Sequence, residues 1–197
     1  AWTTYLDVTP SHRALLIAVL ASAWGLRLGL YLLWRWRSHG HDRRYAKLAE
    51  RAKTKHRLSF AAFAALWVFL PQLFLQLVMA LPALLGPIEP APLGPLAYAG
   101  AALSAFGIIY EAIADAQLTR FKADPANAGK LMDRGLWRYS RHPNYFGDMC
   151  AWWGIFLIAA ETRTGLWSLP GPLLLTFLLT RVSGAPTTEP HMKRTRP

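Results

Sequence analysis

Long apolar stretches alternate with short polar ones along the chain. Residues 14–34 contain one charged side chain, residues 58–85 contain none, and residues 96–118 contain only Glu111 and Asp115. As helices that rise about 1.5 Å per residue, all three stretches are long enough to cross about 30 Å of hydrocarbon. The pattern therefore predicts three membrane-spanning helices before residue 120.

Two shorter apolar stretches follow at residues 145–160 and 166–180, and the segment ETRTG separates them. Stretches of about 15 residues cross a bilayer only with tilt, local thinning or polar flanking turns. We expect them to be a fourth and a fifth crossing, or else a half-buried hairpin.

Apolar stretches of this length favour helices, because backbone inside lipid must satisfy its own hydrogen bonds. Short alternating strands, which a membrane barrel would need, are not the pattern seen here. The predicted fold is all-α: a polytopic integral membrane helical bundle that forms one domain over residues 1–197. The chain starts without Met and stops at KRTRP, so we expect residues to be missing from both ends.

Lysine and arginine gather in three of the connecting segments. Of the 22 such residues, 19 lie in 35–57, 120–141 and 181–197, whereas the connection GPIEPAPLGP has none. This is the positive-inside distribution, and it predicts that all three basic segments face the cytoplasm. Residues 43–53 of the first are predicted to form a short helix at the headgroups, where cations bind anionic membrane lipid. The net charge of +11 thus indicates topology, and we expect no nucleic-acid partner.

Two carboxylates interrupt the third long stretch. Glu111, Asp115 and Lys122 recur at helical spacing, so they share one stripe that emerges at the cytoplasmic end. Charged groups inside an apolar span are costly and by default face a cavity or a partner. They are predicted either to pair with Arg27 or Arg181 and lock helices together, or to accept hydrogen bonds from a polar ligand whose phosphate faces Lys122.

The segment GLWRYSRHPNYFGD (135–148) places a second polar group before an apolar, tryptophan-rich run. Pro143 suits the first turn of a helix, whose free N–H groups then bind anions. Three cationic or titratable side chains come directly before that turn: Arg138, Arg141 and His142. Asn144 and Asp148 lie one turn apart, and Trp152 follows on the next turn. The order indicates a phosphate site, then a carboxamide-sized polar patch, then an apolar wall, in a pocket open to the cytoplasm.

Other chemistries find little support. His39 and His41 have no third imidazole or thiolate with metal-site spacing, so no metal is predicted. The chain contains neither a phosphate-binding loop nor a GxGxxG fingerprint.

Four segments of the chain resemble the bacterial branch of the steroid 5-alpha-reductase-like family, which is related to the sterol C14 and C7 reductases. They are WGLRL (24–28), GHDRRY (40–45), ADAQLTRFKADPANAGKLMDRGLWRYSRHPNYFGD (114–148) and LLLTFLLTRVSGAP (173–186). The third is long and specific, and the resemblance extends from about Trp24 to the C-terminus.

The resemblance implies a membrane reductase that uses NADPH to saturate a carbon–carbon double bond conjugated to a carbonyl, in a steroid-like or isoprenoid lipid. It implies an NADPH pocket lined by Glu111, Asp115, Lys122, Arg141, His142, Asn144, Tyr145 and Arg181. Asp148 is expected beside the nicotinamide, and Asp148 and Tyr145 are the predicted catalytic residues. Trp24 and Trp152 are predicted to face the substrate.

Two departures from the family pattern bear on substrate and completeness. Trp24 stands where steroid-reducing relatives carry a tyrosine that faces the substrate carbonyl. About two further N-terminal helices and a C-terminal Gly-Tyr…Tyr…Arg-Thr tail, both usual in the family, are absent from this sequence.

Two other function classes stay open at this point. Membrane methyltransferases for isoprenylcysteine or phospholipid share a shorter RHPxY signature and use S-adenosylmethionine, but they do not require the ADAQLTRFKADP block (114–125) or the pair of Asn144 and Asp148. A non-catalytic sterol- or lipid-binding membrane protein is the other alternative. An Ala-, Leu- and Arg-rich chain with short loops favours a bacterial cytoplasmic membrane.

Overall fold

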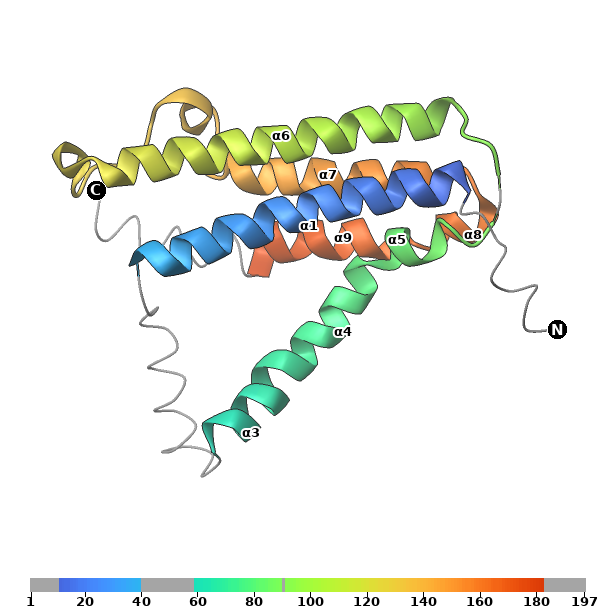
Figure 1. Cartoon of the computed structure of the whole chain (residues 1–197), viewed down its shortest axis with the longest axis horizontal. Helices are drawn as coiled ribbons and strands as arrows, with labels where there is room; N and C mark the ends of the chain where they lie inside the picture. Colours follow the sequence, from blue (N-terminus) through green and yellow to red (C-terminus); the bar gives the residue numbers. More distant parts are fainter. Residues whose placement is uncertain (1–10, 40–58, 90, 183–197) are drawn as a thin grey trace. The chain divides into compact units, whose positions relative to one another are not determined.

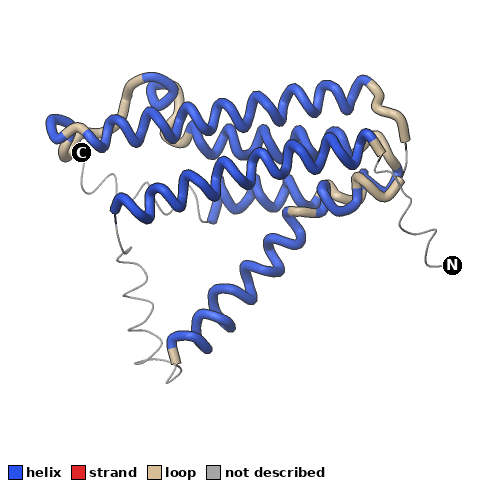
Figure 2. The backbone as a smooth tube through the Cα atoms, in the orientation of Figure 1, coloured by secondary structure: helices blue, strands red, loops and turns tan. Residues whose placement is uncertain are grey.

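The computed structural model describes residues 11–39, 59–89 and 91–182, and these residues form helices and no strand (Figure 2). The α-helices are α1 (His12–His39), α3 (Phe60–Ala64), α4 (Leu70–Met79), α5 (Leu81–Leu85), α6 (Pro95–Ala123), α7 (Pro143–Ala159), α8 (Arg163–Leu166) and α9 (Pro170–Phe177). Two π-helices, η2 (Ala65–Phe69) and η5 (Leu178–Val182), and two 3₁₀ helices, η3 (Pro125–Asn127) and η4 (Gly135–Arg138), complete the described elements.

Four described helical segments are long and apolar enough to cross a membrane: His12–Arg37, Phe60–Met79, Pro95–Ala123 and Arg163–Val182. They coincide with the three long stretches and the last short stretch of the sequence pattern. The remaining stretch forms α7, which has 17 residues. The all-helical, polytopic membrane fold is thereby confirmed, while the helix predicted over residues 43–53 lies outside the described residues.

The chain divides into two compact units. The main unit contains the described residues up to Trp24 and from Met79 onward, and the second unit contains those from Gly25 to Val78. A single domain over residues 1–197 stays a prediction.

The main unit is organised around α6 and α7, which run antiparallel and side by side (Figure 1). Glycines bring the two backbones together. A Cβ added at Gly107 would lie 2.4 Å from Ala151 N, and one added at Gly154 would lie 2.4 Å from Ser104 N. Helix association in membranes depends on such close packing, because lipid gives no hydrophobic driving force between helices.

A small apolar core joins these two helices to α1 and α9. Its fully buried members come from four elements: Ile17, Ala97, Trp152, Ile155, Ile158, Ala159 and Leu175. Burial of this kind fixes the start of α1 beside α7, although the two are far apart in the sequence. The core therefore sets the register in which α1 meets the polar residues of α7.

In the second unit, a π-helical turn precedes Pro71, which has no backbone N–H to donate. The side chains on α4 face outward: Leu73 is 67% exposed and Phe74 is 66% exposed. Exposed apolar residues at this density are unfavourable in water and suit the hydrocarbon of a bilayer. The helix accommodates Pro71 with the wider π-helical turn that precedes it.

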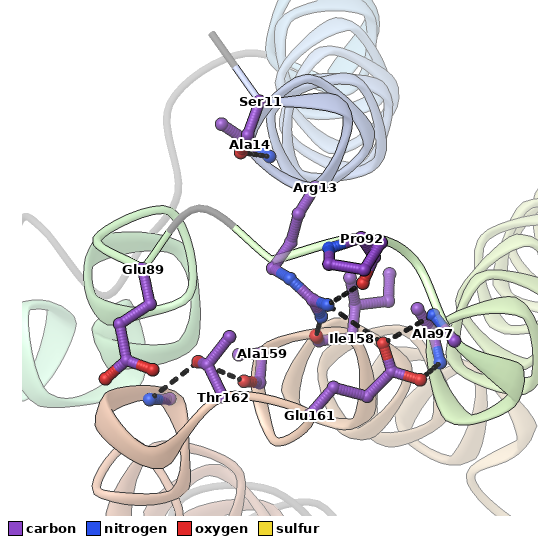
Figure 3. Close-up of polar contacts among 12 residues, drawn as sticks. Ser11, Arg13, Ala14, Glu89, Pro92, Ala97, Ile158, Ala159, Glu161 and Thr162 are labelled. Atoms are coloured by element: carbon purple, nitrogen blue, oxygen red, sulfur yellow. Dashed lines mark hydrogen bonds and ion pairs between the residues drawn. The ribbon is translucent and has the colours of Figure 1, made fainter.

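One buried ion pair joins four segments of the main unit (Figure 3). The Arg13 guanidinium, whose side chain is 0% exposed, donates to Glu161 Oε2 at 2.9 Å, to Pro92 O at 2.7 Å and to Ile158 O. Glu161 in turn accepts from Gly94 N and Ala97 N, each at 2.9 Å, at the start of α6. The beginnings of α1 and α6 and the end of α7 are thus held at one point.

A second carboxylate at the same end caps α8. Glu89 accepts from Arg163 N at 3.2 Å and from Thr164 N at 2.9 Å, and the Thr164 hydroxyl also donates to it. Negative charge at a helix N-terminus is favourable, because it meets free N–H groups and the positive end of the dipole. The turn from α7 into α8 is therefore well defined.

Replacing Gly107 with Ala tests the contact between α6 and α7. The new methyl group has no room between the two backbones, so we expect Gly107→Ala to lower the melting temperature of the detergent-purified protein. Gly29→Ala is the matched control, because no atom lies within 4 Å of a Cβ added there. In an open helical position alanine stabilises by up to about 1 kcal/mol relative to glycine. Equal melting temperatures for the two variants would contradict the packing.

Glu161→Gln tests the ion pair through its pH dependence. Burial alone would raise the pKa of Glu161, but hydrogen bonds from Gly94, Ala97 and Arg13 outweigh it and hold the pKa below the ordinary 4.5. A lowered pKa gives stability that is complete above the ordinary value and is lost as pH falls through the folded-state value. We expect the melting temperature to decrease below pH 4.5 more steeply in the wild type than in the variant.

Glu89→Gln serves as the control for that titration. Hydrogen bonds from Thr164 lower the pKa of Glu89 as well. Glu89→Gln therefore removes a comparable carboxylate while it keeps the ion pair of Arg13 and Glu161. Parallel pH curves for the wild type and Glu161→Gln would contradict the assignment.

Candidate functional site

Two buried carboxylates on α6 face the first turns of α7. Glu111 is 5% exposed and Asp115 is 6% exposed, and they lie one helical turn apart. Gly147 allows α7 to approach them, because a Cβ there would lie 2.7 Å from Glu111 N. The close approach places the carboxylates against α7 rather than against lipid. Pairing of these groups with Arg27 or Arg181 stays a prediction.

Asn144 links the two helices. Helix α7 begins at Pro143 with His142 as the N-cap, as the sequence predicts. In the first turn of the helix, Asn144 Nδ2 donates to Asp115 Oδ1 at 3.4 Å. Asn144 Oδ1 is buried and has no hydrogen-bond partner. This amide therefore presents one satisfied donor and one open acceptor.

Asp148 and Trp152 follow on the same face of α7, and Trp24 of α1 contacts both. Trp24 Nε1 donates to Asp148 Oδ1 at 2.9 Å. The Trp24 and Trp152 rings meet edge to face, with centroids 5.1 Å apart and planes at 79°. Residues 144, 148 and 152 are spaced at four, so the polar face of α7 turns into an aromatic wall within two turns.

The connection between α6 and α7 is fixed by side chains of α6. Gln117 Oε1 accepts from Leu136 N at 2.9 Å, and Trp137 Nε1 donates to Ala114 O at 2.9 Å. Gly135 has a φ of +59°, where a side chain would be strained and would meet Gln117. These contacts hold the residues before Pro143 at the end of α6.

The predicted phosphate-binding cations are exposed. Lys122 lies in the last turn of α6, Arg138 ends η4, and Arg141 precedes α7. Because α6 and α7 are antiparallel, these three side chains belong to the same end of the helix pair. Helix α9 returns antiparallel to α7, as the bond from Trp153 Nε1 to Thr176 Oγ1 shows, so Arg181 on η5 lies toward that end as well.

Beside these cations, His142 and Tyr145 are stacked, with ring centroids 4.9 Å apart and planes at 11°. Both are half-buried. The stack covers the first turn of α7, which carries the free N–H groups of the helix start. The predicted residues are therefore brought together in two groups, a cationic and aromatic end and a buried polar face.

Sequence reasoning missed several residues that position the site. Gln117 and Trp137 carry no chemistry of their own, and no periodicity marks them. Gly135 offered a signal, because a glycine after Arg134 in a short loop often marks a positive φ. The bond between Trp24 and Asp148 joins residues 124 positions apart, and the sequence shows no sign of it.

A model for one protein family, described as "Protein of unknown function (DUF1295)", matches residues 1–197. The chain belongs to the DUF1295 family. The DUF1295 family is related to the steroid 5-alpha-reductase-like proteins, and the resemblance is confirmed at that level. Searches of the curated proteins and of the solved structures found no match.

Trp24→Phe tests the bond between the indole and Asp148. The variant keeps an aromatic ring but removes the N–H, so Asp148 Oδ1 loses a donor in apolar surroundings. We expect the free energy of unfolding to fall by about 1–3 kcal/mol, measured by thermal unfolding in detergent. Trp36→Phe is the control, since Trp36 is 58% exposed. Equal effects of the two substitutions would show that the bond adds no stability.

Proposed function

We propose that this protein is an NADPH-dependent membrane reductase of the steroid 5-alpha-reductase-like type. Its substrate is a steroid-like or isoprenoid lipid with a carbon–carbon double bond conjugated to a carbonyl. The observation that carries the proposal is the face of α7 with Asn144, Asp148 and Trp152. Asn144 contacts Asp115 of α6 and keeps an open amide acceptor, and Asp148 and Trp152 contact Trp24 of α1. We further propose that the site faces the cytoplasm of a bacterial cell, as the basic segments favour.

The residues present fit the cofactor. Asn144 Oδ1 is a buried acceptor without a partner, which a carboxamide N–H of nicotinamide would satisfy. The Glu111 and Asp115 carboxylates suit ribose hydroxyls, which donate hydrogen bonds. Lys122, Arg138, Arg141 and Arg181 supply positive charge for phosphates, and the α7 N-terminus adds free N–H groups.

The chemistry divides between cofactor and protein. NADPH, when bound, would supply the hydride for the β-carbon of the conjugated system, and the protein would have to supply the proton for the α-carbon. Asp148 and Tyr145 are the candidate groups for holding or moving a proton near the substrate. Trp24 fixes one oxygen of Asp148 and so orients its carboxyl.

The tryptophan end of the site suits a lipid substrate. Trp152 belongs to the apolar core together with Ile155, and Trp24 packs against it. An apolar wall excludes water from the reacting atoms and strengthens the electrostatic interactions there. A hydrophobic substrate dissolved in the bilayer reaches such a wall without passing through water.

Ligand-induced thermal stabilisation tests the cofactor. A ligand that binds only the folded state raises the melting temperature with its concentration. We expect NADPH to stabilise the detergent-purified protein more than NADH. Lys122→Ala or Arg141→Ala should weaken NADPH binding about tenfold or more, because each removes a charge-assisted hydrogen bond. Lys130→Ala, at an exposed lysine of the same connection, is the matched control.

The other outcomes identify the alternatives. Stabilisation by S-adenosylmethionine alone would assign the protein to the membrane methyltransferases. No stabilisation by any of the three ligands, for a chain that melts cooperatively, would favour a non-catalytic lipid-binding protein. Unchanged NADPH affinity in both cationic variants would refute the phosphate assignment while leaving the cofactor open.

A further inference from the structure

One polar group in the apolar core of the main unit has no partner. Trp152 is 6% exposed, and its Nε1 is buried without a hydrogen bond. Its neighbour Trp153 is also part of α7, yet Trp153 Nε1 donates to Thr176 Oγ1 at 3.1 Å. Buried donors in folded proteins are almost always satisfied, and leaving one open costs free energy. The open N–H of Trp152 therefore calls for an acceptor from outside the chain.

Trp24, the other indole of the aromatic wall, has no open N–H to offer a ligand. Its Nε1 donates to Asp148 Oδ1 at 2.9 Å. The two rings are in direct contact, with centroids 5.1 Å apart. Of the two N–H groups in this aromatic pair, one orients the carboxyl and the other is left open.

The surroundings of Trp152 define the kind of acceptor. The core that contains Trp152 is aliphatic and aromatic and includes Ile17, Ile155 and Leu175, while Asp148 lies one turn before Trp152 on α7. Water is a poor occupant of such a site, because a buried water needs two to four polar partners. A lipid with a single carbonyl oxygen matches one open donor in an otherwise apolar wall.

We propose that Trp152 Nε1 donates a hydrogen bond to the carbonyl oxygen of the lipid substrate and so selects oxygenated over oxygen-free lipids. This inference rests on the proposed function for its substrate class. The carbonyl lies one turn beyond Asp148 along α7, away from the phosphate end. The donor also stabilises negative charge that develops on that oxygen when a nucleophile adds to the β-carbon.

A matched pair of sterols tests the assignment. Cholest-4-en-3-one and cholest-4-ene share one skeleton, and only the first carries oxygen. We expect Trp152→Phe to weaken binding of the ketone by about fivefold to tenfold, the value of one hydrogen bond, and to leave binding of the alkene unchanged. Binding is measured by concentration-dependent thermal stabilisation in detergent. Trp153→Phe is the control: it removes an indole N–H one residue away, whose partner is within the protein.

Four outcomes of these measurements decide whether Trp152 binds the carbonyl and whether the proposed function holds. Equal loss for both sterols, equal loss in both variants, or failure of the wild-type protein to bind the ketone better than the alkene would overturn the inference. NADPH stabilisation is measured in parallel, and we expect it to be the same in the wild type and Trp152→Phe. If NADPH does not stabilise the wild type but the ketone preference depends on Trp152, the proposed function fails and the carbonyl site stands.

A second measurement covers the case in which Trp152→Phe does not fold. In wild-type protein with ¹⁵N-labelled tryptophan, the nine indoles give separate N–H resonances. We expect the ketone, and not the alkene, to shift one of them downfield, and this resonance should persist in Trp24→Phe and Trp153→Phe. A resonance that disappears in either of those variants would assign the carbonyl to another indole and refute the inference.

Discussion

The main unit depends on a guanidinium that is removed from water. A buried charge is tolerated only when it is paired and its hydrogen bonds are satisfied. Arg13 is paired with one carboxylate, and its two terminal nitrogens also donate to two backbone carbonyls, from the connection before α6 and from the end of α7, while its Nε has no partner among the described residues. The same carboxylate accepts two N–H groups at the start of α6. The need to pair this buried charge therefore holds the beginnings of α1 and α6 beside the end of α7. Glycine contacts then keep α6 and α7 close together as far as the candidate site.

The candidate site combines buried polar groups with an aromatic wall. Its carboxylates are buried on α6, where they are costly without donors, and its amide and aspartate come from α7. Small residues at the helix contact bring these groups within hydrogen-bonding distance, as Asn144 and Asp115 show. The aromatic wall next to them supplies low polarity. The proposed reductase would use this polar face beside an apolar wall, because one of its reactants is a charged dinucleotide and the other a lipid.

Local features of this fold could be predicted from the sequence, and distant contacts could not. The helical runs follow from length and hydropathy, and the start of α7 at Pro143 follows from proline chemistry. The common face of Asn144, Asp148 and Trp152 follows from helical periodicity alone. The role of Arg13 could not be predicted, because its partner Glu161 lies 148 positions away and carries no local signal. The bond between Trp24 and Asp148 escaped for the same reason, and the positions of the exposed cations depend on loop contacts such as that of Gln117.

The separation between Arg13 and Glu161 also bears on how the protein is made. A ribosome delivers α1 to the membrane long before it synthesises the end of α7, so the cation lacks Glu161 and the Ile158 carbonyl until late in biosynthesis. Long-range contacts of this kind form late, so the segments that are synthesised first lack their final neighbours for some time. Until then, α1 must lie in the bilayer with the Arg13 side chain solvated near the surface. The bundle can close around Arg13 only after Glu161 has been synthesised, which makes closure a late step of assembly.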